Sequence, residues 1–203
     1  MTGSAVRAPW LLARCAQLAV GAAAGTEVVR AFDVRARLLH PSAAAAIRSG
    51  WASTVYVDVM TAAMVLFLVW FARCRRNAGL LSPGAVRGSG AWAVVAWLIP
   101  GVNLWAPRGL LLDVQRASGP AGADRDVLVN VWWGAWVGHA VLALAAAQLG
   151  GGTSLPLLVP AESLNLLAAA LVTVVIQRIT ARQAAAADSG LPVPAPAGLP
   201  QAP

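Results

Sequence analysis

Long apolar runs separated by arginine-bearing stretches dominate the pattern of this chain. Four windows are long and apolar enough to cross a bilayer, whose hydrocarbon core of roughly 30 Å takes about 20 helical residues. They are residues 10–29, 51–71, 127–149 and 155–177. A shorter run, residues 91–105, contains the sequence WLIPGVNLW at positions 97–105. The pattern predicts an all-α, polytopic transmembrane helical bundle with four spans and this additional segment.

The composition agrees with a membrane protein. The chain has 203 residues, of which 59% are hydrophobic and 11% charged, and its mean hydropathy is +0.68. An ordinary soluble domain is less apolar. The net charge is +7, and all 15 basic residues are arginine, which together with the abundance of alanine, glycine and proline is typical of a GC-rich bacterial genome. Because the arginines flank apolar runs, they favour contact with anionic lipid headgroups and argue against nucleic-acid binding.

The arginines also predict the topology through the positive-inside rule. If residues 91–105 enter the membrane and return, eleven arginines fall on one side and four on the other. The four are Arg30, Arg35, Arg37 and Arg48. If the segment crosses fully, the arginines divide into six on one side and nine on the other, and this small difference predicts no orientation. We therefore expect a multi-pass protein of a bacterial cell membrane with arginine-rich cytoplasmic loops and both termini in the cytoplasm.

The segment at 91–105 is predicted to be re-entrant. Residues 91–99 span about 13 Å as a helix, half of the hydrocarbon core. Pro100 and Gly101 then turn the chain, residues 102–105 climb back, and the tryptophans at 97 and 105 lie at similar depth near the headgroups. Asn103 would bond backbone groups freed at the turn. The alternative is one proline-kinked helix that crosses fully, giving five spans.

A run of motifs carries a family resemblance. The stretches are WFARCRRN at 70–77, Trp92, WLIPGVNLWAPR at 97–108, Asp113, RAS at 116–118 and Trp132-Trp133. Over roughly residues 50–150 the chain resembles the bacterial membrane-protein family catalogued as domain of unknown function 4328. The resemblance implies a polytopic membrane protein and supplies neither an activity nor catalytic residues.

Carboxylates inside apolar spans are the candidate functional groups, because an ionised side chain in hydrocarbon is costly and usually faces the interior of a bundle. Asp58 shares a helical face with Thr54 and Thr61, Glu162 shares one with Asn165, and Glu27 ends the first span. Six side chains are predicted to converge on one interior pocket: Thr54, Asp58, Thr61, His139, Glu162 and Asn165.

Structural explanations compete with these functional ones. Glu162 can cap a helix that begins at Pro160, and Glu27 can lie in the headgroups beside Arg30. Trp132, Trp136 and His139 share a face at i, i+4 and i+7 spacing. A single histidine in such a place is more often a hydrogen-bonded packing residue than a metal ligand, so neither a metal site nor a cofactor is predicted.

Two classes of function remain. The favoured one is a helical bundle that binds a partner, organises the membrane or handles a small molecule. The alternative is a membrane-embedded enzyme that uses Asp58 or Glu162 as a general acid or base on a lipophilic substrate such as a prenyl chain. The candidate partners are the anionic bilayer, a lipophilic small molecule, another protein and a second copy of the chain.

The chain is predicted to hold one transmembrane domain, residues 1–182, and a tail, residues 183–203. The tail has five prolines and one charge, with too little apolar bulk to pack. We expect it to be disordered.

Overall fold

The computed structural model describes residues 7–86, 88–119 and 124–189. In that part of the chain every regular element is a helix, so the predicted all-α class is confirmed. The helices are α1 (Trp10–Leu39), α2 (Ala43–Leu81), α3 (Gly90–Val95), the 3-10 helix η1 (Val102–Leu104), α4 (Ala106–Ala117), α5 (Asp124–Leu149) and α6 (Leu155–Asp188).

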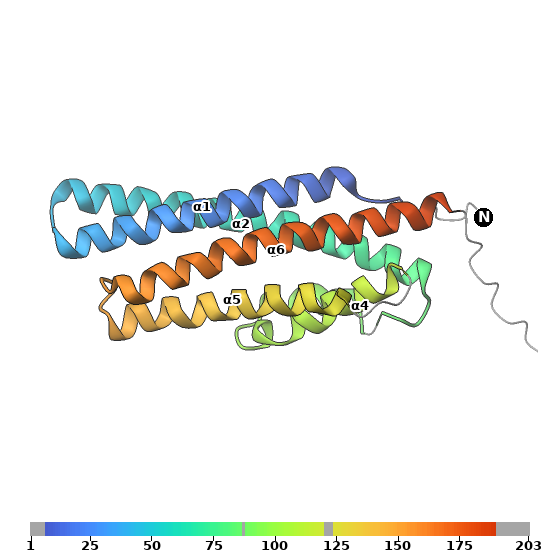
Figure 1. The fold of residues 1–203 in the computed structure, drawn as a ribbon. Helices are drawn as coiled ribbons and strands as arrows, with labels where there is room; N and C mark the ends of the chain where they lie inside the picture. Colours follow the sequence, from blue (N-terminus) through green and yellow to red (C-terminus); the bar gives the residue numbers. More distant parts are fainter. Residues whose placement is uncertain (1–6, 87, 120–123, 190–203) are drawn as a thin grey trace, which may run out of the picture.

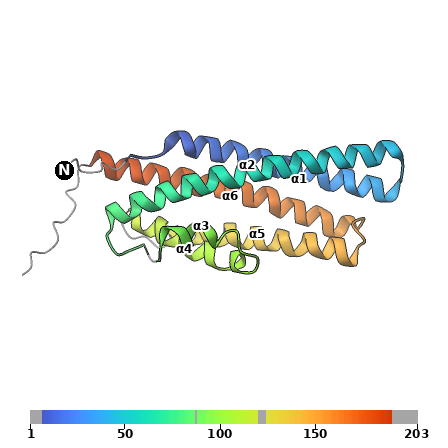
Figure 2. The same cartoon turned by 180° about the vertical axis from the view of Figure 1, so that it is seen from behind.

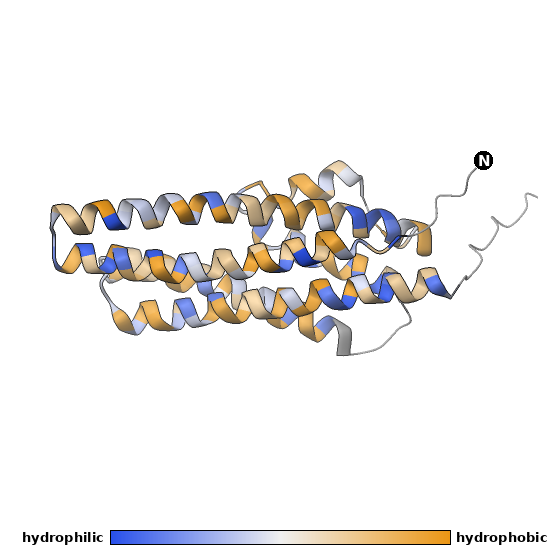
Figure 3. Cartoon of the chain, turned by 90° about the horizontal axis from the view of Figure 1, so that it is seen from above, coloured by the Kyte–Doolittle hydropathy of each residue, from blue (hydrophilic) through white to orange (hydrophobic). Residues whose placement is uncertain are grey.

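Four long helices lie side by side and form the body of the molecule (Figures 1 and 2). Helix α1 packs against α2, α5 packs against α6, and α1 also packs against α6, which joins the two pairs. Apolar residues occur along the whole length of the helices (Figure 3), and many large ones are exposed, among them Leu18, Val65 and Leu144. A helix that is apolar all round is typical of a membrane environment.

Two short turns, one within each helix pair, lie at the same end of the bundle (Figure 1). Between α1 and α2, the Ser42 hydroxyl accepts a hydrogen bond from the Ala45 amide at 3.1 Å and caps the new helix. Between α5 and α6, three successive glycines at 150–152 reverse the chain. Helix α1 begins and α6 ends at the opposite end of the bundle (Figure 1).

Three helical stretches are long and apolar enough to span a membrane: Ala43–Leu81, Asp126–Leu149 and Leu155–Asp188. They correspond to three of the four predicted spans. Helix α1 is not among them, although it is one of the long helices of the bundle (Figure 1). Its sequence carries Arg14, Glu27, Arg30 and further charges, which lower its hydropathy. Composition therefore supports three spans directly.

The segment between α2 and α5 is a helical hairpin. Helix α3 starts at the end of the bundle where α2 stops, the chain turns near the middle of the bundle's length, and α4 returns to the same end (Figures 1 and 2). Gly101 has a φ of +83°, a conformation that costs other residues strain. The returning limb differs from the prediction: residues 102–105 belong to the turn, and α4 makes the return.

The two tryptophans of the hairpin lie in different surroundings. The Trp97 ring packs on Phe67 and Phe71, with ring centroids 4.8 and 5.5 Å away. Trp105 is 66% exposed. The face of the hairpin that carries Ala93, Ala96 and Trp97 is turned toward the core, and the turn at Gly101 leaves Trp105 outside it.

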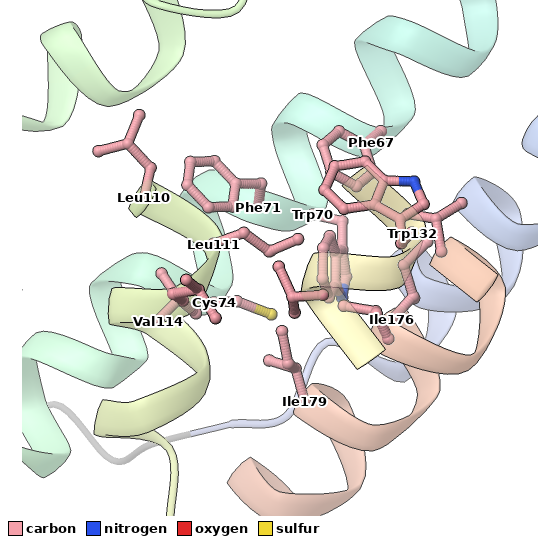
Figure 4. Close-up of a cluster of buried hydrophobic side chains, with 14 of the residues drawn as sticks. Phe67, Trp70, Phe71, Cys74, Leu110, Leu111, Val114, Trp132, Ile176 and Ile179 are labelled. Atoms are coloured by element: carbon pink, nitrogen blue, oxygen red, sulfur yellow. The ribbon is translucent and has the colours of Figure 1, made fainter. Parts of the chain in front are cut away.

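A cluster of buried apolar side chains lies where the hairpin meets α2 and α6 (Figure 4). Six side chains there are fully buried: Trp70, Phe71, Leu111, Val114, Ile176 and Ile179. In a lipid environment helices associate through van der Waals packing, and this cluster supplies such contacts between the hairpin and the long helices.

A satisfied polar network ties the same end together. The fully buried Gln183 amide donates to the Cys74 carbonyl at 2.8 Å and to the Ser118 hydroxyl at 3.0 Å, and its oxygen accepts from Asn77 at 2.9 Å. Gln183 was predicted to begin the disordered tail. That boundary is wrong, because α6 continues to Asp188; residues 190–203 lie outside the described part of the chain.

Candidate ligand cavity

A cavity of about 350 Å³ lies between the two helix pairs, at the tip of the hairpin. Residues from α1, α2, α5, α6 and the hairpin line it. The positions of the lining residues along their helices distinguish two ends of the cavity. Phe67, Trp97 and Trp132 lie at the end near the hairpin. Glu27 and Asn165 lie at the end toward the short turns. The two ends differ in chemistry.

The hairpin end is aromatic. Trp97, Trp132, Trp133 and Trp136 all line the cavity. The Trp133 and Trp136 rings stack with centroids 5.0 Å apart, and Trp132 meets Trp133 edge-on at 5.5 Å. The Trp97 indole N–H is buried and has no hydrogen-bond partner among the described residues. Buried tryptophan N–H groups usually find an acceptor, so this donor is an exception.

At the other end, an ion pair lies beside the cavity. Arg30 Nε donates to Glu27 Oε2 at 2.7 Å, and Arg30 Nη2 donates to Glu27 Oε1. The Arg30 guanidinium also lies over the Tyr56 ring, 5.0 Å from its centroid. Glu27 is only 5% exposed. A two-bonded pair of this kind reduces the cost of burying both charges inside an apolar bundle.

A second carboxylate, Glu162 on α6, is also 5% exposed. Its Oε2 accepts a 3.3 Å hydrogen bond from the Asn165 amide, which also donates to the Ala24 carbonyl. Pro160 lies inside α6 rather than at its start, so the suggestion that Glu162 caps a new helix is wrong. Glu162 is close enough to Glu27, Arg30 and His139 to interact with them electrostatically.

His139 on α5 faces the same region. Its Nδ1 lies 3.0 Å from the Ala161 carbonyl, which only accepts, so Nδ1 carries the proton. In the neutral ring Nε2 is then an acceptor. The i, i+4, i+7 spacing predicted a shared face for Trp132, Trp136 and His139, and all three line the cavity. No group of three metal-ligating side chains occurs among the described residues.

The predicted six-residue pocket forms only in part. His139 and Asn165 line the cavity, with Glu162 bonded behind Asn165, and Glu27 and Asn103 line it as well. Asp58, Thr54 and Thr61 are exposed on the other side of α2, so their expected place in the pocket is wrong. Tyr56 faces the cavity, and a position two residues along a helix lies about 200° further round.

The inner face of α2 is the part that sequence reasoning missed. Tyr56, Met60, Ala63 and Phe67 line the cavity at i, i+4, i+7 and i+11 spacing. Their signal was the helical spacing of three large side chains, Tyr56, Met60 and Phe67. The threonines on the opposite stripe need no interior partner, since Thr54 and Thr61 donate to the Gly50 and Val57 carbonyls.

Comparison with protein families gave a match over residues 35–184 to the family described as Domain of unknown function (DUF4328). The chain belongs to this family. The match confirms the resemblance and extends it in both directions, so that it contains all of α2 to α5 and most of α6. Comparison with curated proteins and with solved structures gave no match.

Most of the cavity lies within the DUF4328 match. The lining residues of α2, the hairpin, α5 and α6 fall inside it, as does Glu162. The lining residues of α1, Glu27 among them, precede its first residue. Both members of the Glu27–Arg30 ion pair therefore come from the part of the chain before the match.

Proposed function

We propose that this protein is an integral protein of a bacterial cell membrane that crosses it four times, with α1, α2, α5 and α6 as spans. The hairpin of α3 and α4 re-enters from the cytoplasmic side, where both termini lie. The eleven-to-four arginine distribution supports this orientation, and so does the position of both hairpin ends at one end of the bundle. The cytoplasmic arginines contact anionic headgroups.

Pairing of its charges makes α1 tolerable as a span. Arg30 is held by Glu27, and Arg14 lies near the start of the helix, where a long side chain reaches the interface. The Arg14 guanidinium also lies 5.7 Å from the centroid of the Trp10 ring. Paired or interfacial charges cost far less in a membrane than isolated ones at its centre.

Within this bundle, we propose that the cavity binds a lipophilic small molecule. The single observation that carries the proposal is the cavity itself, about 350 Å³ in volume and lined mainly by apolar and aromatic side chains. Ligand pockets of small molecules have volumes of about 300–1,000 Å³ and the same mixture of apolar walls with a few polar groups.

An enzyme that uses Asp58 is not proposed, because this carboxylate lies on the outer side of α2, away from the cavity. Glu162 is held beside the cavity by Asn165, and a part in binding accounts for its position. The favoured class is therefore the one that handles a small molecule.

Binding of a neutral lipophilic fluorophore tests the proposal. N-phenyl-1-naphthylamine accepts energy from tryptophan, so its saturable binding to the purified protein in detergent is read by energy transfer. Ala140→Phe fills the cavity from α5 and should abolish this binding. Val141→Phe adds the same ring at the next position, which is 59% exposed, and should leave it intact. Equal binding by both variants would refute the proposal.

A further inference from the structure

The polar end of the cavity carries an excess of acidic groups. Two buried carboxylates, Glu27 and Glu162, stand against one guanidinium, Arg30, which already gives two hydrogen bonds to Glu27. His139 adds an acceptor, since its Nδ1 proton is directed at the Ala161 carbonyl. None of the described residues that line the cavity is an arginine. The polar end therefore suits a positive charge better than a negative one.

The aromatic end suits the same kind of charge. The face of an indole or phenol ring is electron-rich and attracts cations, most strongly where water is excluded. Trp133 and Trp136 stack with an interplanar angle of 25°, and both residues line the cavity. Tyr56 already holds one cation in this way, the Arg30 guanidinium. The walls of the cavity would thus stabilise a charge that a purely aliphatic pocket would reject.

We infer that the ligand is a lipophilic monocation, one with its charge spread over an apolar body or shielded by alkyl groups. This inference rests on the proposed function and narrows it to one class of ligand. A compact, strongly hydrated cation would lose its water on entering an apolar cavity and gain too little in return. An anion would meet the Glu27 carboxylate at the cavity wall, the negative charge of Glu162 behind Asn165, and the faces of several rings. The unpartnered Trp97 N–H would bond a polar atom elsewhere on the same ligand or a bound water.

Two ions of the same shape and opposite charge distinguish the effect of ligand charge on binding from the effect of ligand size. Tetraphenylphosphonium and tetraphenylborate each carry four phenyl rings on a central atom. Specific binding is the part of the signal that Ala140→Phe removes, which corrects for partition into detergent. The wild-type protein should bind the phosphonium at least about tenfold more tightly than the borate. This comparison needs no variant at the acidic cluster, so its result does not depend on how such a variant folds.

Glu162→Gln then tests the source of the preference. The amide keeps the shape of the carboxylate and an oxygen for the Asn165 hydrogen bond, and it removes one negative charge. We expect the affinity for the phosphonium to fall about tenfold while binding of neutral N-phenyl-1-naphthylamine stays unchanged. Asp58→Asn makes the same change of charge on the outer side of α2 and should alter neither ligand.

Each outcome decides one claim. Equal specific binding of the two ions, or tighter binding of the borate, would overturn the cation inference and leave the cavity as a site for neutral molecules. A phosphonium affinity unchanged in Glu162→Gln and lowered in Asp58→Asn would overturn the assignment to this end of the cavity. If neither Ala140→Phe nor Ala169→Phe on α6 removes the binding of any ligand, both the inference and the proposed function fail.

Discussion

The groove between α2 and α5 is filled over one half of its length and hollow over the other. In the filled half, the hairpin packs between the helices, and Trp70, Phe71 and Leu111 are fully buried (Figure 4). In the hollow half, Trp133 and Trp136 are only partly buried and their rings border the cavity. The same residue type thus closes the core at one end and lines a cavity at the other.

Length explains the difference. Helix α4 has 12 residues and α5 has 26, which correspond to about 18 and 39 Å at 1.5 Å per residue. A hairpin of this length fills about half of the groove. The remaining half stays open because α2 packs on α1 while α5 packs on α6. The turn at Gly101 therefore decides where dense packing ends and the cavity begins.

The largest expected effect comes from truncating an aromatic residue in the filled half. Phe71→Ala should lower the free energy of unfolding by about 3–5 kcal/mol, because a fully buried ring leaves a cavity that its neighbours cannot close. Trp136→Ala, in the hollow half, should cost at least about 2 kcal/mol less. Unfolding in mixed micelles, followed by circular dichroism, measures both. Equal costs would show that the two halves are packed alike.

The polar network at the filled end gives the next largest effect. Gln183→Leu removes an amide that donates to two acceptors and accepts from Asn77, and it leaves those buried groups without a partner. Stranded buried polar groups cost about 1–3 kcal/mol, so we expect the free energy of unfolding to fall by about 2 kcal/mol. Gln177→Leu, at a half-buried position on the same helix, is the matched control and should cost less than half as much.

The turn of the hairpin is expected to show a smaller effect. Gly101→Ala places a side chain at a φ of +83°, which should cost about 1–2 kcal/mol. Gly109 lies in α4 with a helical backbone and open space around it, so Gly109→Ala should leave stability unchanged or raise it by up to about 1 kcal/mol. Thermal unfolding of the two variants measures the difference. A neutral Gly101→Ala would mean that the turn relaxes without strain.

The outer side of α2 should give the smallest effect. Asp58 is exposed and makes no hydrogen bond or ion pair with the described residues. Asp58→Leu should therefore leave the free energy of unfolding unchanged or raise it, since an apolar side chain suits a lipid-facing position better than a carboxylate. Ligand binding should also persist. A loss of more than about 1 kcal/mol would show that Asp58 has an interior partner.

The sequence predicted the order of elements better than their faces. Length and hydropathy located α2, α5 and α6, and the half-length run with Pro100 and Gly101 located the hairpin. The inner face of α2 was not predictable from periodicity, because a helix in lipid is apolar on both sides and no amphipathic stripe distinguishes them. Asp58 was therefore predicted to face the interior because it is charged, whereas Tyr56, Met60 and Phe67 are the large side chains of α2 that line the cavity.

In the candidate site too, some residues could be predicted from the sequence and others could not. His139 and Asn165 were predicted because polar groups on an apolar helix stand out, and Trp136 followed from its spacing to His139. Trp97 was assigned to the interface, because a tryptophan beside a turn resembles an anchor residue. Its place in the aromatic cluster depends on how the hairpin docks on α2. That docking is a tertiary contact that no local pattern encodes.

The central claim, that the hairpin enters and leaves the bundle at one membrane face, is tested most directly by the accessibility of single cysteines. In a background with Cys15→Ser and Cys74→Ala, the exposed positions Ser89, Arg116 and Pro41 each receive a cysteine. An impermeant thiol reagent on intact cells should label Pro41→Cys and should reach Ser89→Cys and Arg116→Cys only after permeabilisation. Labelling of Arg116→Cys in intact cells, with Ser89→Cys protected, would contradict the account, because the segment would then cross the membrane completely.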